Sequence, residues 1–150
     1  MRRLDRSFGL GPALATLAIV LGSATLAWHG AFAPPAAGNE GAKVTPAFAY
    51  DLPNLPGRTV TGVLVEYDPG GGSAPHHHTT KGSVVAYVLE GAIRSKVNDG
   101  PVMVYQAGES WLEPPGAAHS VSENASATEP APLLAVFVAE AGAELTTFDQ

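Results

Sequence analysis

Three consecutive histidines form the stretch of the sequence best suited to chemistry. His76, His77 and His78 directly follow a loop rich in glycine, serine and proline. On an extended segment, residues two apart point to the same face, so the imidazoles of His76 and His78 can converge while His77 points away. His119 lies far along the chain, just after the turn at 114–116, where it could bring in a third imidazole. Because the chain has no cysteine, these histidines would supply most of the nitrogen ligands of a metal ion.

Short stretches of alternating or apolar residues surround these histidines and predict strands. A loop is predicted at 68–75, and a hairpin at 99–100, where Asp-Gly tolerates positive φ. We therefore expect an all-β antiparallel sandwich or barrel of about eight strands. Since closure removes exposed edges, we favour one small antiparallel β-barrel. The predicted strands are 59–67, 84–90, 92–98, 102–105, 110–113, 119–124 and 133–140.

The first part of the chain carries an export pattern. A short basic head of arginines precedes residues 10–28, which contain no charge, as in a signal peptide. The uncharged run approaches the length that spans a bilayer, so residues 1–33 are predicted to be a signal peptide or a membrane-anchor helix. We expect a flexible linker at 34–43 and the folded domain at 44–150. The domain would then be exported, in the periplasm, secreted or anchored to the inner membrane.

Composition excludes several functional classes. The length of 150 residues suggests one domain, and the 17 glycines and 13 prolines favour turns and short strands over long helices. The net charge of -6 argues against binding of nucleic acid, which needs a basic surface. The absence of cysteine excludes disulfides, zinc–thiolate sites and thiol catalysis.

The spacing of the histidines relative to nearby glycines and prolines resembles the two motifs of small single-domain cupins of the type-2 kind. Cupins have a jelly-roll-like barrel, also described as a double-stranded β-helix. The resemblance covers residues 59–140, and it implies that His76, His78 and His119 bind a metal inside the barrel. It leaves the reaction open, because this fold hosts many functions. The first motif is matched by Gly70, His76, His78 and Gly91, and the second by Gly108, Pro114, Gly116 and His119, with Asn124 one residue late.

The glutamate of the first cupin motif is missing from this sequence. Its place is taken by one of the residues at 82–84. Glu113 is a candidate substitute, as a metal ligand or as an acid–base group, because it lies just before the turn that delivers His119; the alternative is a surface carboxylate at a strand end. We expect a divalent transition metal (iron, manganese, nickel, copper or zinc), since magnesium and calcium prefer oxygen ligands.

Two functions of different kinds are compatible with these residues. A bound metal could polarise a substrate oxygen or activate oxygen or water, as in a metal-dependent oxidoreductase such as a dioxygenase, or an isomerase or lyase, acting on a small organic molecule. The alternative is a non-catalytic module that binds a small ligand. A homodimer and a membrane tether through the N-terminus are further expectations. Four aromatic residues could line a ligand cavity or fill the core: Tyr87, Tyr105, Trp111 and Phe137.

Overall fold

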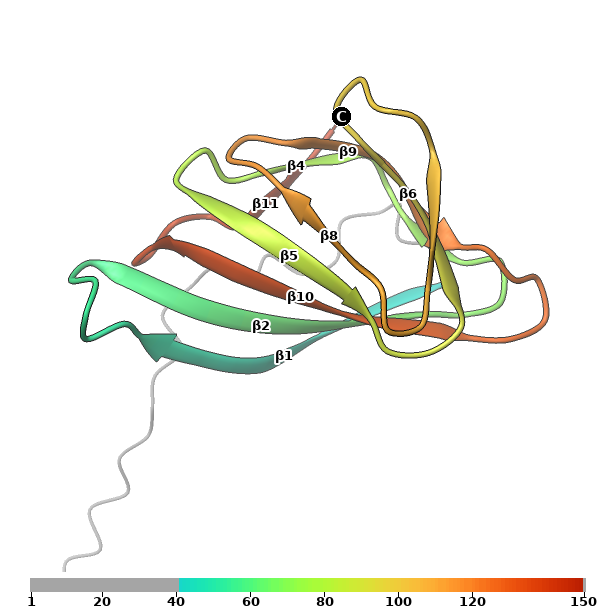
Figure 1. Cartoon of the computed structure of the whole chain (residues 1–150), viewed down its shortest axis with the longest axis horizontal. Helices are drawn as coiled ribbons and strands as arrows, with labels where there is room; N and C mark the ends of the chain where they lie inside the picture. The colour runs from blue at the N-terminus through green and yellow to red at the C-terminus, as the bar shows by residue number, and fades with distance from the viewer. Residues whose placement is uncertain (1–40, 150) are drawn as a thin grey trace, which may run out of the picture.

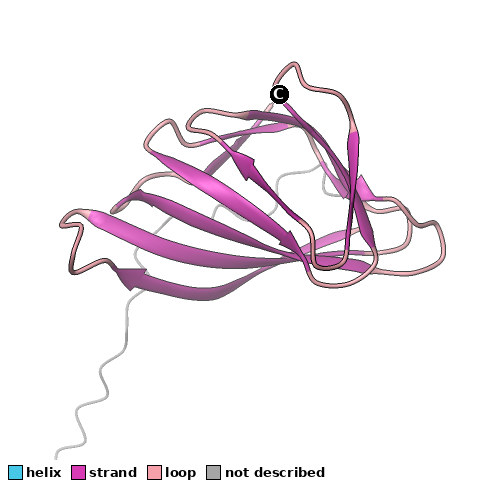
Figure 2. Cartoon of the chain, in the orientation of Figure 1, coloured by secondary structure: helices cyan, strands magenta, loops and turns pink. Residues whose placement is uncertain are grey.

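The computed structural model of the chain describes residues 41–149, in which every regular element is a strand (Figure 1, Figure 2). Eleven strands form two antiparallel sheets. The expected signal or anchor at 1–33 lies outside the described residues, as does most of the expected linker. Within 41–149 there is no helix of the length and apolar character needed to cross a membrane.

The first sheet contains the longest strands and has the order β1-β2-β10-β5-β8. At its centre, β2 (Arg58–Tyr67) and β10 (Ala131–Glu140) pair along their whole length. Strand β5 (Gly82–Val88) pairs with the other side of β10. The edges are β1 (Ala42–Asp51) and β8 (Ser110–Glu113). This sheet is the lower, broad layer in Figure 1.

The second sheet contains shorter strands and carries the histidine triplet. Its order is β11-β4-β9-β6-β7, and β3 also pairs with β9. The histidine strand β4 therefore lies between β11 and β9, which come from the last third of the chain. The bounds are β3 (Gly72–Ser73), β4 (His76–His78), β6 (Ala92–Val97), β7 (Met103–Gln106), β9 (Ala118–Asn124) and β11 (Thr146–Phe148).

The chain passes back and forth between the two sheets but does not close into a barrel. From β4 onward, β5, β8 and β10 belong to the first sheet, and the strands between them belong to the second. Within 41–149, no strand pairing joins an edge of one sheet to an edge of the other. The expected closed barrel is therefore corrected to a sandwich of two sheets. The edge strands β7, β8 and β11 are only three or four residues long, and short edges also limit pairing with other chains.

Inward-facing side chains from both sheets hold the layers together. Burial alternates along β5, and Val84, Ala86 and Val88 face the interior, as the two-residue period of a strand requires. Ile93 of β6, on the opposite sheet, is fully buried against Ala86 and Val88. Burying a valine or isoleucine side chain stabilises the fold by about 1.5–3 kcal/mol. These contacts fix the spacing of the two sheets.

The predicted strands agree closely with the observed ones. The prediction at 110–113 coincides with β8, and the other six differ from observed strands by one or two residues at their ends. Four observed strands have no counterpart among the predicted ranges: β1, β3, β4 and β11. For β4, only the argument on the histidine spacing assumed an extended segment. In β1, Ala42 and Lys43, which we expected in the linker, pair with Tyr67 and Glu66 of β2.

Candidate metal centre

Strand β4 presents its three histidines alternately to the interior and to solvent. His76 and His78 are buried, with 7% and 8% of their surface exposed. His77 lies on the opposite face, where 52% of its side chain is exposed and its Nδ1 lies 2.7 Å from a carboxylate oxygen of Asp149. This is the arrangement that the two-residue spacing predicts.

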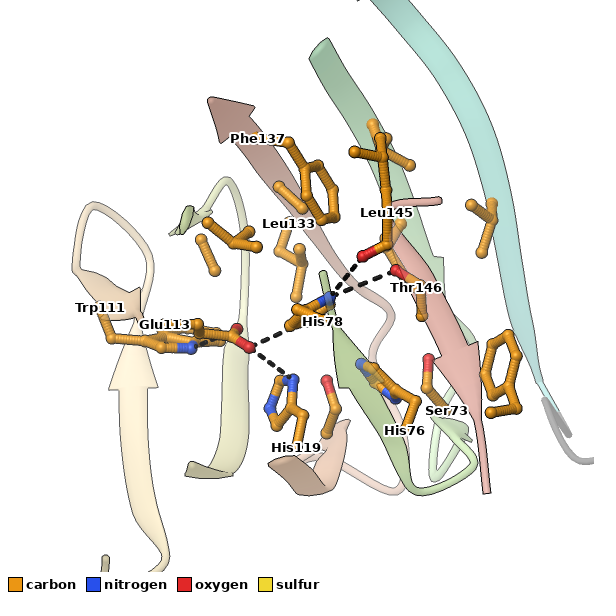
Figure 3. A pocket seen from close by; sticks show the side chains of 18 of the residues that line it. Ser73, His76, His78, Trp111, Glu113, His119, Leu133, Phe137, Leu145 and Thr146 are labelled. Carbon is orange, nitrogen blue, oxygen red and sulfur yellow. Dashed lines mark hydrogen bonds and ion pairs between the residues drawn. The ribbon is translucent and has the colours of Figure 1, made fainter. Parts of the chain in front are cut away.

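Strand β9 brings His119 beside the buried pair. In the β4–β9 ladder, His119 is the register partner of His76, and their ring centroids are 5.0 Å apart. A β-bulge in the β6–β9 pairing lies next to His119, and such bulges redirect side chains. Ring nitrogens of His76, His78 and His119 all lie within 4.8 Å of one another. The three histidines, whose rings lie together in Figure 3, could hold a metal ion.

Buried hydrogen bonds orient the two imidazoles of β4. Nδ1–H of His76 donates to the carbonyl oxygen of Ala74 at 2.8 Å, because a carbonyl can only accept. Nδ1 of His78 lies 3.4 Å from the carbonyl oxygen of Leu145 and 3.3 Å from the hydroxyl of Thr146. In His76, Nε2 is then the nitrogen with a free lone pair, and in His78 it has one when Nδ1 donates to Leu145. Contacts of this kind fix the orientation of metal-ligating histidines.

Strand β8 places a carboxylate against the histidines. Glu113 is only 2% exposed, and Nε1–H of Trp111 donates to its Oε1 at 2.9 Å. Its other oxygen, Oε2, lies 2.9 Å from Nε2 of His78 and 3.3 Å from Nδ1 of His119. Despite these short distances, Oε2 has no hydrogen-bond partner among the described residues. The Ser95 hydroxyl, 2.8 Å from Nε2 of His119, can accept from that nitrogen and leave Nδ1 facing Glu113.

Oε2 of Glu113 and Nε2 of His78 face each other at 2.9 Å in the interior. When Nε2 of His78 carries the ring proton, that proton lies between the two groups and favours the ionised carboxylate. When Nδ1 carries it and donates to Leu145 at 3.4 Å, Nε2 and the carboxylate oxygen are two acceptors facing each other. Two such atoms repel unless a cation lies between them. Two donors that each lie about 2.0–2.2 Å from one metal ion, at a right angle, are separated by about 3 Å. The spacing of Oε2 of Glu113 and Nε2 of His78 therefore fits a shared metal ion.

Burial and neighbouring charges set the protonation of the group. Burial lowers the pKa of His76 to about 4, and burial also lowers the pKa of His119 from its usual 6.5. Burial raises the pKa of Glu113, but His78, His119 and the Trp111 N–H together outweigh this effect and lower the pKa from 4.5. At neutral pH, His76 and His119 are neutral and Glu113 is ionised, which is the state that metal ligation requires.

The candidate metal ligands line an apolar cavity between the sheets. Its volume is about 470 Å³, within the range of small-molecule sites. Trp111 and Phe137, two of the four aromatic candidates, line it (Figure 3). Tyr105 instead stacks on Trp111, with ring centroids 4.5 Å apart, and Tyr87 is 43% exposed. A small organic molecule would therefore lie directly beside the candidate metal ligands.

A family model described as a cupin domain matches residues 63–137. The chain belongs to the cupin family. The fold of two sheets and the positions of the three histidines agree with the resemblance noted in the sequence. No curated protein matches this cupin in a sequence comparison.

Solved structures similar to this cupin include two enzymes. An oxalate oxidase in complex with glycolate matches 78% of this chain and 62% of its own, with 24% identity and a TM-score of 0.56; the cupin thus spans less than two thirds of that enzyme. The Lactobacillus farciminis oxalate decarboxylase–formate complex matches 59% of this chain and 26% of its own, with 25% identity and a TM-score of 0.51. An uncharacterized Klebsiella pneumoniae protein with a double-stranded β-helix domain matches 61% of this chain and 75% of its own, with 22% identity and a TM-score of 0.51.

In this cupin the buried carboxylate comes from the strand next to the expected one. The motif glutamate is missing at 82–84, on β5. Val84 pairs directly with Glu113 across the β5–β8 ladder, and both side chains face the interior, 1% and 2% exposed. Directly opposite residues have Cβ atoms about 4.5–5.5 Å apart. Glu113 therefore supplies a carboxylate close to the motif position, and it is not a surface residue.

Several polar residues of the cavity were not identified from the sequence. The Tyr67 hydroxyl hydrogen bonds with the Ser122 hydroxyl at 2.7 Å and with the Ser73 hydroxyl at 3.0 Å, and all three residues line the cavity. Ser95 contacts His119. These residues come from four strands, and only the register brings them together. The one sequence signal was the alternation that places Ser95 on the apolar face of its predicted strand.

Proposed function

We propose that this cupin binds one divalent transition-metal ion through His76, His78, His119 and Glu113, and acts on a small organic molecule in the adjoining cavity. The observation that carries the proposal is the buried Oε2 of Glu113. It faces ring nitrogens of His78 and His119 at 2.9 and 3.3 Å with no hydrogen-bond partner in residues 41–149. A buried carboxylate oxygen without a partner is unfavourable, and a shared metal ion would supply that partner.

The donor set indicates the class of metal. Imidazole ligands suit iron, nickel, copper and zinc, and a carboxylate adds manganese. Magnesium and calcium prefer sets made of oxygen ligands. When bound, such an ion supplies Lewis-acid chemistry at a ligand oxygen or at water.

The protein's own side chains orient the donors and shield them from water. Trp111 holds one oxygen of Glu113 and leaves the other directed at the histidines. The ring of Phe137 packs edge-on against His78 with centroids 5.4 Å apart, and Phe148 packs against His76 at 5.5 Å. Charges interact more strongly in such apolar surroundings than in water. These residues therefore favour tight binding of a polar group at the metal.

The reaction that we propose is that of a metal-dependent oxidoreductase or isomerase. Two solved structures similar in fold, an oxalate oxidase and an oxalate decarboxylase, are enzymes, which supports catalysis without assigning the substrate. The cavity beside the candidate ligands supports an organic substrate.

Metal analysis of the purified full-length chain tests this proposal. We expect close to one transition-metal ion per chain after reconstitution, and loss of most of it in His119→Ala. His77→Ala is the matched control, because His77 lies on the outer face of β4, and it should retain the ion. A wild-type chain that binds no transition metal, or a His77→Ala variant that loses as much metal as His119→Ala, would contradict the proposal.

A non-catalytic ligand-binding cupin is a second function that one observation favours. Glu113 is the only carboxylate among the residues that line the described cavity, and metal binding would occupy it. No other carboxylate there can then act as a general base. Mass spectrometry of a copurifying ligand, before and after incubation with metal and air, decides between the two functions: unchanged ligand favours the binding module, and a product favours the enzyme.

We also propose that the domain is exported. The basic head and the uncharged run at 10–28 support this. Fusing residues 1–40 to a reporter that is active only outside the cytoplasm tests it, and an inactive reporter would count against export. N-terminal sequencing of the mature protein separates a cleaved signal peptide from an anchor.

A further inference from the structure

No cationic side chain of residues 41–149 lines the cavity beside the candidate metal ligands. The lysines and arginines of residues 41–149 are Lys43, Arg58, Lys81, Arg94 and Lys96, and none of them lines the cavity. Lys43, Lys81 and Arg94 instead form ion pairs with carboxylates at the surface. Within the described part of the chain, the metal ion is therefore the only cation that could pair with a negatively charged ligand in this cavity.

The net charge of the proposed metal site can be balanced by one negative charge on a ligand. A divalent ion, three neutral imidazoles and the Glu113 carboxylate together carry one positive charge. One monoanionic oxygen donor neutralises this charge. A dianion would leave a net negative charge within apolar walls, even with both of its carboxylates at the metal, and an unbalanced buried charge is strongly unfavourable.

A hydrogen-bond donor also faces the cavity. Two hydrogen bonds join the hydroxyls of Tyr67, Ser73 and Ser122, so they use two of the three O–H protons. Within the described part of the chain, the third proton remains to be donated to a ligand. Burial raises the pKa of Tyr67, so its hydroxyl stays protonated at neutral pH. A neutral donor suits the second oxygen of a monocarboxylate and does not balance a full second charge.

The remaining walls of the cavity are aliphatic and aromatic. Val63, Leu133, Phe137, Leu145 and Phe148 line it, and the volume of about 470 Å³ is far more than a two-carbon acid fills. We propose that the site takes a monoanionic oxygen ligand with an apolar body, such as a medium-chain or aromatic monocarboxylate, and selects against dicarboxylates. This inference rests on the proposed metal site and names the ligand class that it takes.

Calorimetric titration of the zinc-loaded full-length chain tests the inference with acetate, butanoate, hexanoate and adipate. Adipate has the same six carbon atoms as hexanoate, with a second carboxylate in place of the terminal methyl group. We expect affinity to rise about fourfold per methylene from acetate to hexanoate, and hexanoate to bind at least a hundredfold more tightly than adipate. Equal affinities for hexanoate and adipate, no rise with chain length, or no binding of any of the four acids would each overturn the inference.

A matched pair of variants locates the binding of the apolar body. Ala135 lines the cavity, whereas its neighbour Val136 points to the other face of β10. Ala135→Phe should lower hexanoate affinity at least tenfold and leave acetate affinity and zinc content unchanged, and Val136→Phe should change none of the three. If Ala135→Phe does not fold, Ala135→Leu should show a smaller loss in the same direction. Unchanged hexanoate affinity in a folded Ala135 variant would overturn the inference.

Zinc content separates the failure of this inference from that of the proposed function. A wild-type chain that cannot be loaded with any transition metal overturns both. A chain that binds zinc through the histidines but takes adipate as well as hexanoate overturns the ligand class alone, and the metal site stands.

Discussion

The two sheets of this cupin differ in what they contribute to stability and to metal ligation. The first sheet has three strands of ten residues and supplies most of the apolar core, but only Glu113 among the candidate ligands. No strand of the second sheet is longer than seven residues, yet this sheet carries His76, His78 and His119. A metal ion held by both sets would connect the sheets. Metal affinity and the stability of the metal-free protein should therefore respond to different substitutions.

The largest effect is expected from removing a ligand in the histidine sheet. His78→Ala should lose most of the metal, and with it the stabilisation of about 4 kcal/mol that an ion gives at a thousandfold excess over its Kd. Metal content and thermal unfolding with and without metal measure both effects. His77→Ala should behave like the wild type. Full metal content in His78→Ala would contradict the assigned role.

Acid should lower the stability of the metal-free protein through the buried histidines of the second sheet. Because the pKa of His76 is lowered from 6.5 to about 4 by burial, the unfolded chain binds more protons at this residue between these pH values. The free energy of unfolding should therefore decrease as pH falls through this window, by about 3 kcal/mol. His119 shifts in the same direction.

Urea unfolding across this pH window measures the effect. The His76→Asn variant, which lacks the titrating ring, should show a flatter profile. A wild-type profile with no slope would show that His76 is not held neutral by the fold.

A core substitution in the first sheet should lower stability and leave metal binding unchanged. Leu133 of β10 is 4% exposed and lines the cavity, so Leu133→Ala should lower the free energy of unfolding by about 2–3 kcal/mol. The value is at the low end for leucine because one side of the residue already faces open space. Metal content at saturation should stay that of the wild type. Loss of metal together with stability would show that the two sheets are not separable.

The smallest effect is expected from the one candidate ligand of the first sheet. Glu113→Gln keeps the shape of the side chain and removes its charge, so metal affinity should fall by at least about tenfold, the loss that even an outer-shell partner causes, while the histidines retain some binding. A competition titration with a chelating dye measures the change. Glu90→Gln, at an exposed glutamate, is the control. Unchanged affinity in Glu113→Gln would remove Glu113 from the ligand set.

The strands that could be predicted from the sequence are those with one buried face. Strands β5, β8 and β10 have a clear interior side, and their residues show it. Strand β1 was missed because most of its residues are exposed and its pairing with β2 shifts register between Pro46 and Phe48. Strand β11 has three residues and depends on its pairing with β4. Barrel closure was predicted wrongly because it depends on which edges meet in space.

The candidate site was predictable where spacing alone decides it. The two-residue spacing of His76 and His78 gave their common face, and the second motif gave His119. Glu113 was indicated only by its place before a turn, since its position opposite Val84 follows from strand register. The hydroxyls of Tyr67 and Ser122 are 55 residues apart, and no local pattern connects them.

The position of β4 between β9 and β11 has a consequence for the order of events during synthesis. His76 pairs with His119 on one side and with Phe148 on the other, and His77 meets Asp149, 72 residues later in the chain. Pairings between such distant segments form slowly. Until β9 and β11 have been made and have paired with β4, a metal ion can bind any of the three adjacent histidines equally well. The difference between His77 and its two neighbours as ligands is therefore acquired only when the chain folds.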